Sequence, residues 1–101
     1  MSVRITGATL PDGTRRDLVV ENGVFVDATS GDTTIDADGL QALPGLVDLH
    51  THLREPGFEQ SETVLTGSRA AAIGGFTAVF AMANTMPVQD TAGVVEQVQS
   101  L

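Results

Sequence analysis

Residues 44–57 read PGLVDLHTHLREPG, and this stretch decides which fold the chain can adopt. Side chains alternate along residues 46–53 in a way that predicts a β-strand. In a strand, residues i and i+2 lie on one face, whereas in a helix they point about 200° apart. His50 and His52 can therefore bind one metal ion only if this segment is extended, and the alternation indicates that it is.

The alternation divides the side chains of this segment into two rows. One row is ionisable and consists of Asp48, His50, His52 and Arg54; the other is mostly apolar and consists of Val47, Leu49, Thr51 and Leu53. We expect the apolar row to face covering helices and the ionisable row to face the interior of a barrel. An unpaired buried charge would cost several kcal/mol. The ionisable row therefore favours a metal ion with a bound anion over one hydrogen-bonded core histidine beside an exposed one.

The first forty residues predict a small β unit. Strand candidates lie at residues 3–10, 16–21, 24–28 and 33–36, and a turn at Asp38-Gly39 leads into residues 40–43. Turn motifs such as Asn22-Gly23 separate them, and turns at this spacing favour antiparallel pairing. We expect residues 1–43 to form a small, sandwich-like β domain.

From residue 44 the pattern changes to strands that alternate with helices. Strands are expected at 46–53 and 76–82, and helices at 61–73 and 91–101, with Ser61 and Asp90 as N-caps. This order is typical of a parallel sheet covered by helices, and a closed (β/α)₈ barrel typically has about 250 residues. Residues 44–101 are therefore expected to be the first two βα units of such a barrel in a longer α/β chain. A complete α+β domain of about 100 residues is the alternative.

The composition excludes several classes of function. Thirteen acidic residues outnumber five basic ones, so the formal net charge is −8, which makes nucleic acid or an anionic membrane a poor partner. The chain has no cysteine, so metal ligands must come from His, Asp and Glu. No apolar run approaches the roughly 18 residues of a membrane span, and no signal peptide is evident. We expect a cytoplasmic protein.

Two longer motifs resemble one family. GLVDLHTHLREPG, followed by GGFTAVFAMANTMPVQD, is similar to dihydroorotases of the amidohydrolase superfamily over residues 44–90. The D-x-H-x-H element is shared by many amidohydrolases, whereas L-R-E-P-G and A-M-A-N-T-x-P are narrower. The resemblance implies a hydrolase of pyrimidine biosynthesis that reversibly cyclises N-carbamoyl-L-aspartate to dihydroorotate.

The resemblance also implies roles for individual residues. His50 and His52 would be metal ligands, the metal being zinc, with two ions in a complete site. Asp48 would either orient a ligand histidine without binding the metal itself, or contribute to the electric field around the ion. The remaining ligands and the acid–base aspartate are expected beyond Leu101, as is the bridging ligand, which is either a carboxylated lysine or an aspartate. Residues 1–101 alone are therefore expected neither to catalyse nor to bind metal tightly.

Substrate contacts are expected from His52, Arg54 and Asn84, with Arg54 holding a carboxylate. Two alternatives stay open at this point. Arg54 could form a surface salt bridge with Glu55 or Glu59, and Asn84 could only stabilise a turn.

Two other functions also remain open. One is a related cyclic-amide hydrolase, such as a hydantoinase, dihydropyrimidinase or allantoinase. The other is a non-catalytic scaffold for aspartate transcarbamoylase, which could also be a partner of an active enzyme. A small-molecule substrate and a homo-oligomer complete the expected partners.

Overall fold

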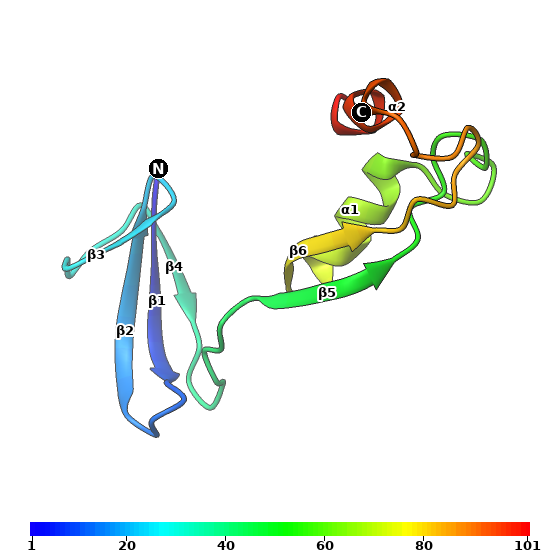
Figure 1. Ribbon diagram of the computed structural model, residues 1–101. Helices are drawn as coiled ribbons and strands as arrows, with labels where there is room; N and C mark the ends of the chain where they lie inside the picture. Colours follow the sequence, from blue (N-terminus) through cyan, green and yellow to red (C-terminus); the bar gives the residue numbers. More distant parts are fainter. The chain divides into compact units, whose positions relative to one another are not determined.

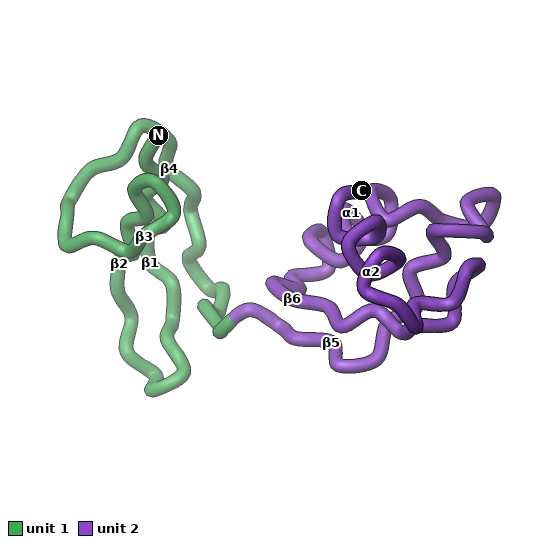
Figure 2. Tube along the Cα trace, turned by 45° about the horizontal axis from the view of Figure 1, so that its top comes forward, with its two compact units in different colours: residues 1–44 green, residues 45–101 purple.

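A computed structural model describes residues 1–101 and divides them into two compact units (Figure 1). Unit 1 is Met1–Pro44 and unit 2 is Gly45–Leu101 (Figure 2). Unit 1 contains strands only, whereas unit 2 contains strands and helices in alternation. The chain is therefore mixed α/β, and each unit has its own sheet.

Unit 1 is one four-stranded sheet in the order β3-β2-β1-β4. Its strands are β1 (Ser2–Thr9), β2 (Arg15–Glu21), β3 (Val24–Val26) and β4 (Thr33–Asp36). β2 pairs antiparallel with β1 and with β3, as the turn motifs predict. A sandwich-like domain would need a second sheet facing this one, and unit 1 has a single sheet.

The expectation of an entirely antiparallel unit is wrong for β4, which pairs parallel to β1. The segment after β3 returns to the end of the sheet where β1 begins. There the backbone N–H of Ser2 donates to Asp32 Oδ2 (2.8 Å), and the N–H of Asp32 donates to Ser2 Oγ (3.0 Å). In residues 40–43, Gln41 forms an isolated bridge with Thr9.

Unit 2 consists of two consecutive βα units. Their elements are β5 (Leu46–Thr51), α1 (Val64–Ile73), β6 (Phe76–Ala81) and α2 (Ala92–Gln99). β5 and β6 pair in parallel, and α1 packs against β6 (Figure 1). The predicted order of strands and helices is therefore confirmed. Both strands end earlier than expected, so the residues that follow them lie in loops at the carboxyl edge of the sheet.

The caps of the two helices differ from the expected ones. α1 begins after Thr63, whose Oγ1 accepts from the backbone N–H of Thr66 (3.1 Å), while Thr66 Oγ1 accepts from the N–H of Thr63 (2.9 Å). Ser61 instead belongs to the preceding turn, where its N–H donates to the carbonyl of Phe58. The N-cap of α2 is Thr91, not Asp90. Neither helix has the length and apolar character needed to cross a membrane.

The apolar row of β5 is only partly covered. Val47 and Leu49 are 53% and 71% exposed, which corrects the expectation that helices bury the whole row. α1 lies over β6 rather than over these two residues. At the other end of the row, Leu53 is half-buried and lies close to the α1 backbone, since a Cβ at Gly67 would come within 2.6 Å of its Cδ2.

Candidate functional site

The two histidines of the motif converge at the carboxyl end of β5. His50 lies within the strand and His52 immediately follows it. Their Nε2 atoms are 3.2 Å apart, and the ring centroids are 5.1 Å apart at an interplanar angle of 56°. The imidazoles therefore lie on the same side of an extended segment, as the spacing predicts. The pairing of β5 with β6 shifts register between Asp48 and Thr51. The two imidazoles converge despite this irregularity in the strand.

The separation of the two nitrogens fits a shared metal ion. Two histidine nitrogens that bind one tetrahedral zinc at about 2.0–2.1 Å each lie about 3.3 Å apart. The observed 3.2 Å matches that value without any movement of the backbone. The pair supplies two ligands, and the chain has no cluster of three or more His, Cys, Asp or Glu side chains that could hold a metal.

Asp48 acts on the backbone of this segment in the structure. Its Oδ1 accepts from the backbone N–H of His50 at 3.0 Å, and neither imidazole contacts its carboxylate. This bond spans the irregular stretch between Asp48 and Thr51. Asp48 therefore holds the local backbone conformation from which His50 projects.

Asn84 reaches His52 from the loop that follows β6. Its Oδ1 lies 2.8 Å from Nδ1 of His52, although 32 positions separate the two residues. The carboxyl ends of neighbouring parallel strands meet at one edge of a sheet, and β5 and β6 are such neighbours. Asn84 therefore contacts the histidine pair directly, instead of only stabilising a turn.

A cavity of about 400 Å³ lies beside Asn84 and is lined by Arg54, Phe58, Ser61 and Asn84. Arg54 is its one charged residue. The chain's two ion pairs join Arg4 to Asp17 and Arg15 to Asp38, so Arg54 takes part in neither. The structure thus brings Arg54 and Asn84 to one cavity, with Asn84 also touching His52.

The acidic neighbours of Arg54 are engaged elsewhere. Glu55 Oε2 accepts from the backbone N–H of Val64, the first residue of α1, at 2.8 Å. Glu59 Oε1 accepts from the N–H of Gly57, also at 2.8 Å, and this bond lowers the pKa of Glu59. The alternative of a salt bridge between Arg54 and Glu55 or Glu59 is therefore not what the structure shows.

The loops after β5 and β6 are joined to each other. The backbone N–H of Met86 donates to the carbonyl of Pro56 (3.0 Å). Gly57 has φ +102°, and a Cβ there would lie 2.5 Å from Cβ of Met86. Thr85 is only 3% exposed, and its hydroxyl donates to the carbonyl of Pro87 (2.8 Å). Sequence reasoning missed these supporting residues, although the P-G step and the T-x-P step mark the two positions.

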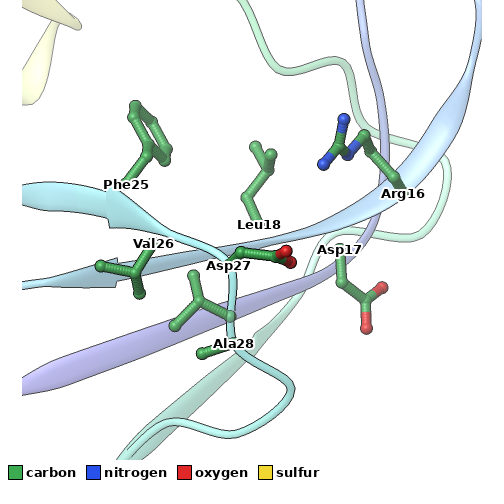
Figure 3. A pocket seen from close by; sticks show the side chains of 8 residues that line it. Arg16, Asp17, Leu18, Phe25, Val26, Asp27 and Ala28 are labelled. Atoms are coloured by element: carbon green, nitrogen blue, oxygen red, sulfur yellow. The ribbon is translucent and has the colours of Figure 1, made fainter.

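Unit 1 holds cavities of a different character. One of about 280 Å³ is lined by residues of β2 and β3 and of the segment after β3. Figure 3 shows Arg16 and Leu18 on one side of β2 and Asp17 on the other, as a strand requires. Another, of about 420 Å³, is mainly apolar. Neither contains a histidine, so the candidate metal ligands occur only in unit 2.

Known proteins of one family resemble this chain in sequence. The model of the dihydro-orotase-like family matches residues 39–101. A dihydroorotase of Leifsonia xyli subsp. xyli is 72% identical over 96% of this chain and 23% of its own length. One of Streptomyces coelicolor is 59% identical over 96% of this chain and 24% of its own length.

One solved structure has a similar fold. The L-hydantoinase (dihydropyrimidinase) of Arthrobacter aurescens superposes with a TM-score of 0.74 at 26% identity, over 97% of this chain and 24% of that chain. The chain thus spans about a quarter of the length of the relatives that it matches. The match to the family model covers more than half of the chain, including every candidate site residue. The chain belongs to the dihydro-orotase-like family.

Proposed function

We propose that this chain is part of a zinc-dependent dihydroorotase, which interconverts N-carbamoyl-L-aspartate and dihydroorotate by closing and opening a cyclic amide. The observation that carries the proposal is the pair of Nε2 atoms 3.2 Å apart, connected through Asn84 to a cavity that holds an unpaired arginine. The names of the relatives support the same reaction.

Arg54 accounts for the recognition of the substrate. Both N-carbamoyl-L-aspartate and dihydroorotate carry a free carboxylate, and a guanidinium can bind a carboxylate through two parallel hydrogen bonds. Because no carboxylate of the chain pairs with Arg54, its donors are available to a ligand in the cavity. The contact between Arg54 and the substrate carboxylate would also orient the substrate ring.

The histidine pair places the chemistry next to that contact. His50 and His52 would hold the metal, which when bound supplies Lewis-acid chemistry, by lowering the pKa of water and polarising the amide carbonyl. Arg54 and Asn84 restrict how the substrate can lie against the pair. The acid–base aspartate and the remaining ligands belong to parts of the protein other than residues 1–101.

Two other functions are distinguishable from this one. The likeness to an L-hydantoinase favours a related cyclic-amide hydrolase, but a substrate that lacks the carboxylate makes no use of Arg54. A non-catalytic scaffold for aspartate transcarbamoylase has no need of two converging imidazoles.

The test uses the full-length protein that contains this chain. It is stripped of metal with a chelator, and turnover of dihydroorotate and of hydantoin is measured before and after zinc is restored. We expect zinc-dependent turnover of dihydroorotate that exceeds turnover of hydantoin. Preference for hydantoin would establish the related hydrolase, and zinc-loaded protein without activity on either ring would establish the scaffold.

Several features of the proposal come from the resemblance. They are zinc as the metal, two ions in the complete site, a homo-oligomer and an association with aspartate transcarbamoylase, whereas the cytoplasmic location is an expectation from the sequence. Metal analysis of the purified full-length protein measures the identity and number of its metal ions. Its mass in solution, with and without the transcarbamoylase, measures the oligomeric state and the association.

A further inference from the structure

We propose that Asn84 is a positioning residue that fixes the proton of His52 on Nδ1. This inference builds on the proposed metal site and concerns how one of its ligands is prepared. Its basis is the 2.8 Å contact between Asn84 Oδ1 and His52 Nδ1. An amide oxygen accepts hydrogen bonds and cannot donate them, so the nitrogen facing it must carry the hydrogen.

The position of that hydrogen determines what the other ring nitrogen can do. A neutral imidazole has one N–H and one nitrogen with a free lone pair. With the hydrogen on Nδ1, the Nε2 of His52 has the lone pair, and this is the atom that lies 3.2 Å from Nε2 of His50. Asn84 therefore holds His52 in the form that can bind a metal at the point where the two rings converge.

The two histidines differ in this respect. Nδ1 of His50 has no hydrogen-bond partner in the structure, and the one bond that Asp48 makes is to the backbone of His50. Without metal, His50 can donate from Nε2 to the lone pair on His52. His50 must then move its proton to Nδ1 before it can bind a metal, whereas His52 is already prepared.

Hydrogen bonds fix the backbone on both sides of Asn84. The carbonyl of Ala83 accepts from the N–H groups of Thr85 (2.9 Å) and Gln89 (3.1 Å), which closes the loop around Asn84. Just before this loop, the N–H of Met82 donates to the carbonyl of Thr51 (2.7 Å), which joins it to the end of β5. The backbone on both sides of Asn84 is therefore fixed relative to the strand that carries the histidines.

The other end of the amide is free for a separate task. Nδ2 of Asn84 has no acceptor in the structure, and Asn84 lines the cavity of Arg54. An aspartate at this position would keep an acceptor for His52 but lose the donor. The substitution Asn84→Asp therefore separates the contact with His52 from any contact with a ligand in the cavity.

The experiment measures the proton directly. Full-length protein with ¹⁵N-labelled histidine is studied without metal by NMR, at a pH above the usual range of histidine pKa values. We expect His52 to be protonated on Nδ1 in the wild type and in Asn84→Asp, and to become a mixture of both forms in Asn84→Ala. Zinc affinity, measured by competition with a chelator, should fall about 10- to 100-fold in Asn84→Ala and stay within a few-fold of the wild type in Asn84→Asp.

Ser61→Ala is the matched control, because Ser61 lines the same cavity and its side chain forms no hydrogen bond with a histidine. It should change neither the tautomer nor the zinc affinity. A wild-type His52 protonated on Nε2 would overturn the inference, as would an Asn84→Ala variant that keeps both the Nδ1 proton and the wild-type zinc affinity. The wild-type spectrum decides the first point even if a variant fails to fold. A protein with the expected tautomers but no turnover of dihydroorotate would refute the proposed function and leave this inference standing.

Discussion

Arg54 is the residue on which substrate choice depends most directly in the proposed function. It is the one charged residue of its cavity, and the carboxylates of Glu55 and Glu59 both accept from backbone N–H groups. A guanidinium left in this state can bind an incoming carboxylate without first breaking an ion pair. The carboxylates that could compete for Arg54 are therefore already bound to backbone N–H groups.

Replacing Arg54 should therefore weaken recognition of the substrate carboxylate. In the full-length enzyme, Arg54→Met should lower kcat/KM for dihydroorotate about 10- to 100-fold, since a hydrogen bond to a charged group contributes about 1.5–3 kcal/mol. Arg54→Lys keeps the charge but not the planar pair of donors, so its loss should be smaller. Steady-state kinetics measure both. Equal activity of the wild type and Arg54→Met would show that Arg54 does not bind the substrate carboxylate.

The sequence predicts the histidine pair well and its surroundings poorly. His50 and His52 follow from alternation alone, because a strand places i and i+2 on one face whatever packs around it. The contact between Asn84 and His52 depends on two loops 32 positions apart in the sequence, and no local pattern encodes such a contact. No local pattern encodes the hydrogen bond from the N–H of Val64 to Glu55 either.

At the scale of elements, the site depends on the two loops that follow β5 and β6. Met86 donates to the carbonyl of Pro56, and Gly57 lets the two backbones approach. Strand order and helix order were predictable, because apolar runs and Gly-Gly steps are local signals. Helix caps were not, since Thr63 and Thr91 are the caps, while the N–H groups of Ser61 and Asp90 donate to the carbonyls of Phe58 and Val88 in the preceding loops.

Gly57→Ala should disturb both loops together. The new Cβ would lie 2.5 Å from Cβ of Met86, at a backbone φ of +102°. We expect the full-length protein to lose about 1–3 kcal/mol of stability, and substrate KM to rise. Gly75→Ala is the matched control: its φ is +84°, but nothing lies within 4 Å of the added atom. Thermal midpoints of the two variants separate the steric clash from the backbone strain, and identical midpoints would show that the close approach has no effect.

In the sheet of unit 1, one carboxylate links β1 to β2. Nη2 of Arg4 donates to Asp17 Oδ2 (2.7 Å), and the N–H of Gly7 donates to Asp17 Oδ1 (2.9 Å). These bonds, first the one from Arg4, lower the pKa of Asp17. A carboxylate whose pKa is lower in the folded state stabilises the fold above its unfolded pKa of about 3.9 and loses that effect as the pH falls through the folded value.

Asp17→Asn should therefore lower stability near neutral pH and flatten its dependence on pH below about pH 4. The thermal midpoint of the full-length protein, followed as the pH is lowered, provides the measurement. Asp27→Asn is the control, because Asp27 is exposed and forms no hydrogen bond or ion pair. Parallel pH profiles for Asp17→Asn and the wild type would contradict the prediction.

At the scale of the whole molecule, residues 1–101 bury little apolar surface. The buried hydrophobic core consists of Ala8, Val19 and Ala37, which all lie in unit 1. Phe25, Leu49 and Phe80 are 71%, 71% and 56% exposed. Burial of apolar area is the main favourable contribution to folding, and these exposed side chains do not provide it.

A polypeptide of residues 1–101 should therefore not fold cooperatively by itself. We expect it to bind a fluorescent dye that recognises apolar surface, to unfold over a broad temperature range, and to show neither turnover nor tight zinc binding. Calorimetry of this polypeptide beside the full-length protein provides the comparison. A sharp unfolding transition without dye binding would show that the two units are stable as they stand.

The hydrogen bond between Pro56 and Met86 has a consequence for protein engineering. Each loop supplies one side of the cavity, and each is shaped by the backbone of the other. A loop transplanted from a relative with a different substrate would not fit the backbone of the other loop. Libraries that alter ring specificity should therefore diversify residues 54–60 and 83–90 as a single cassette.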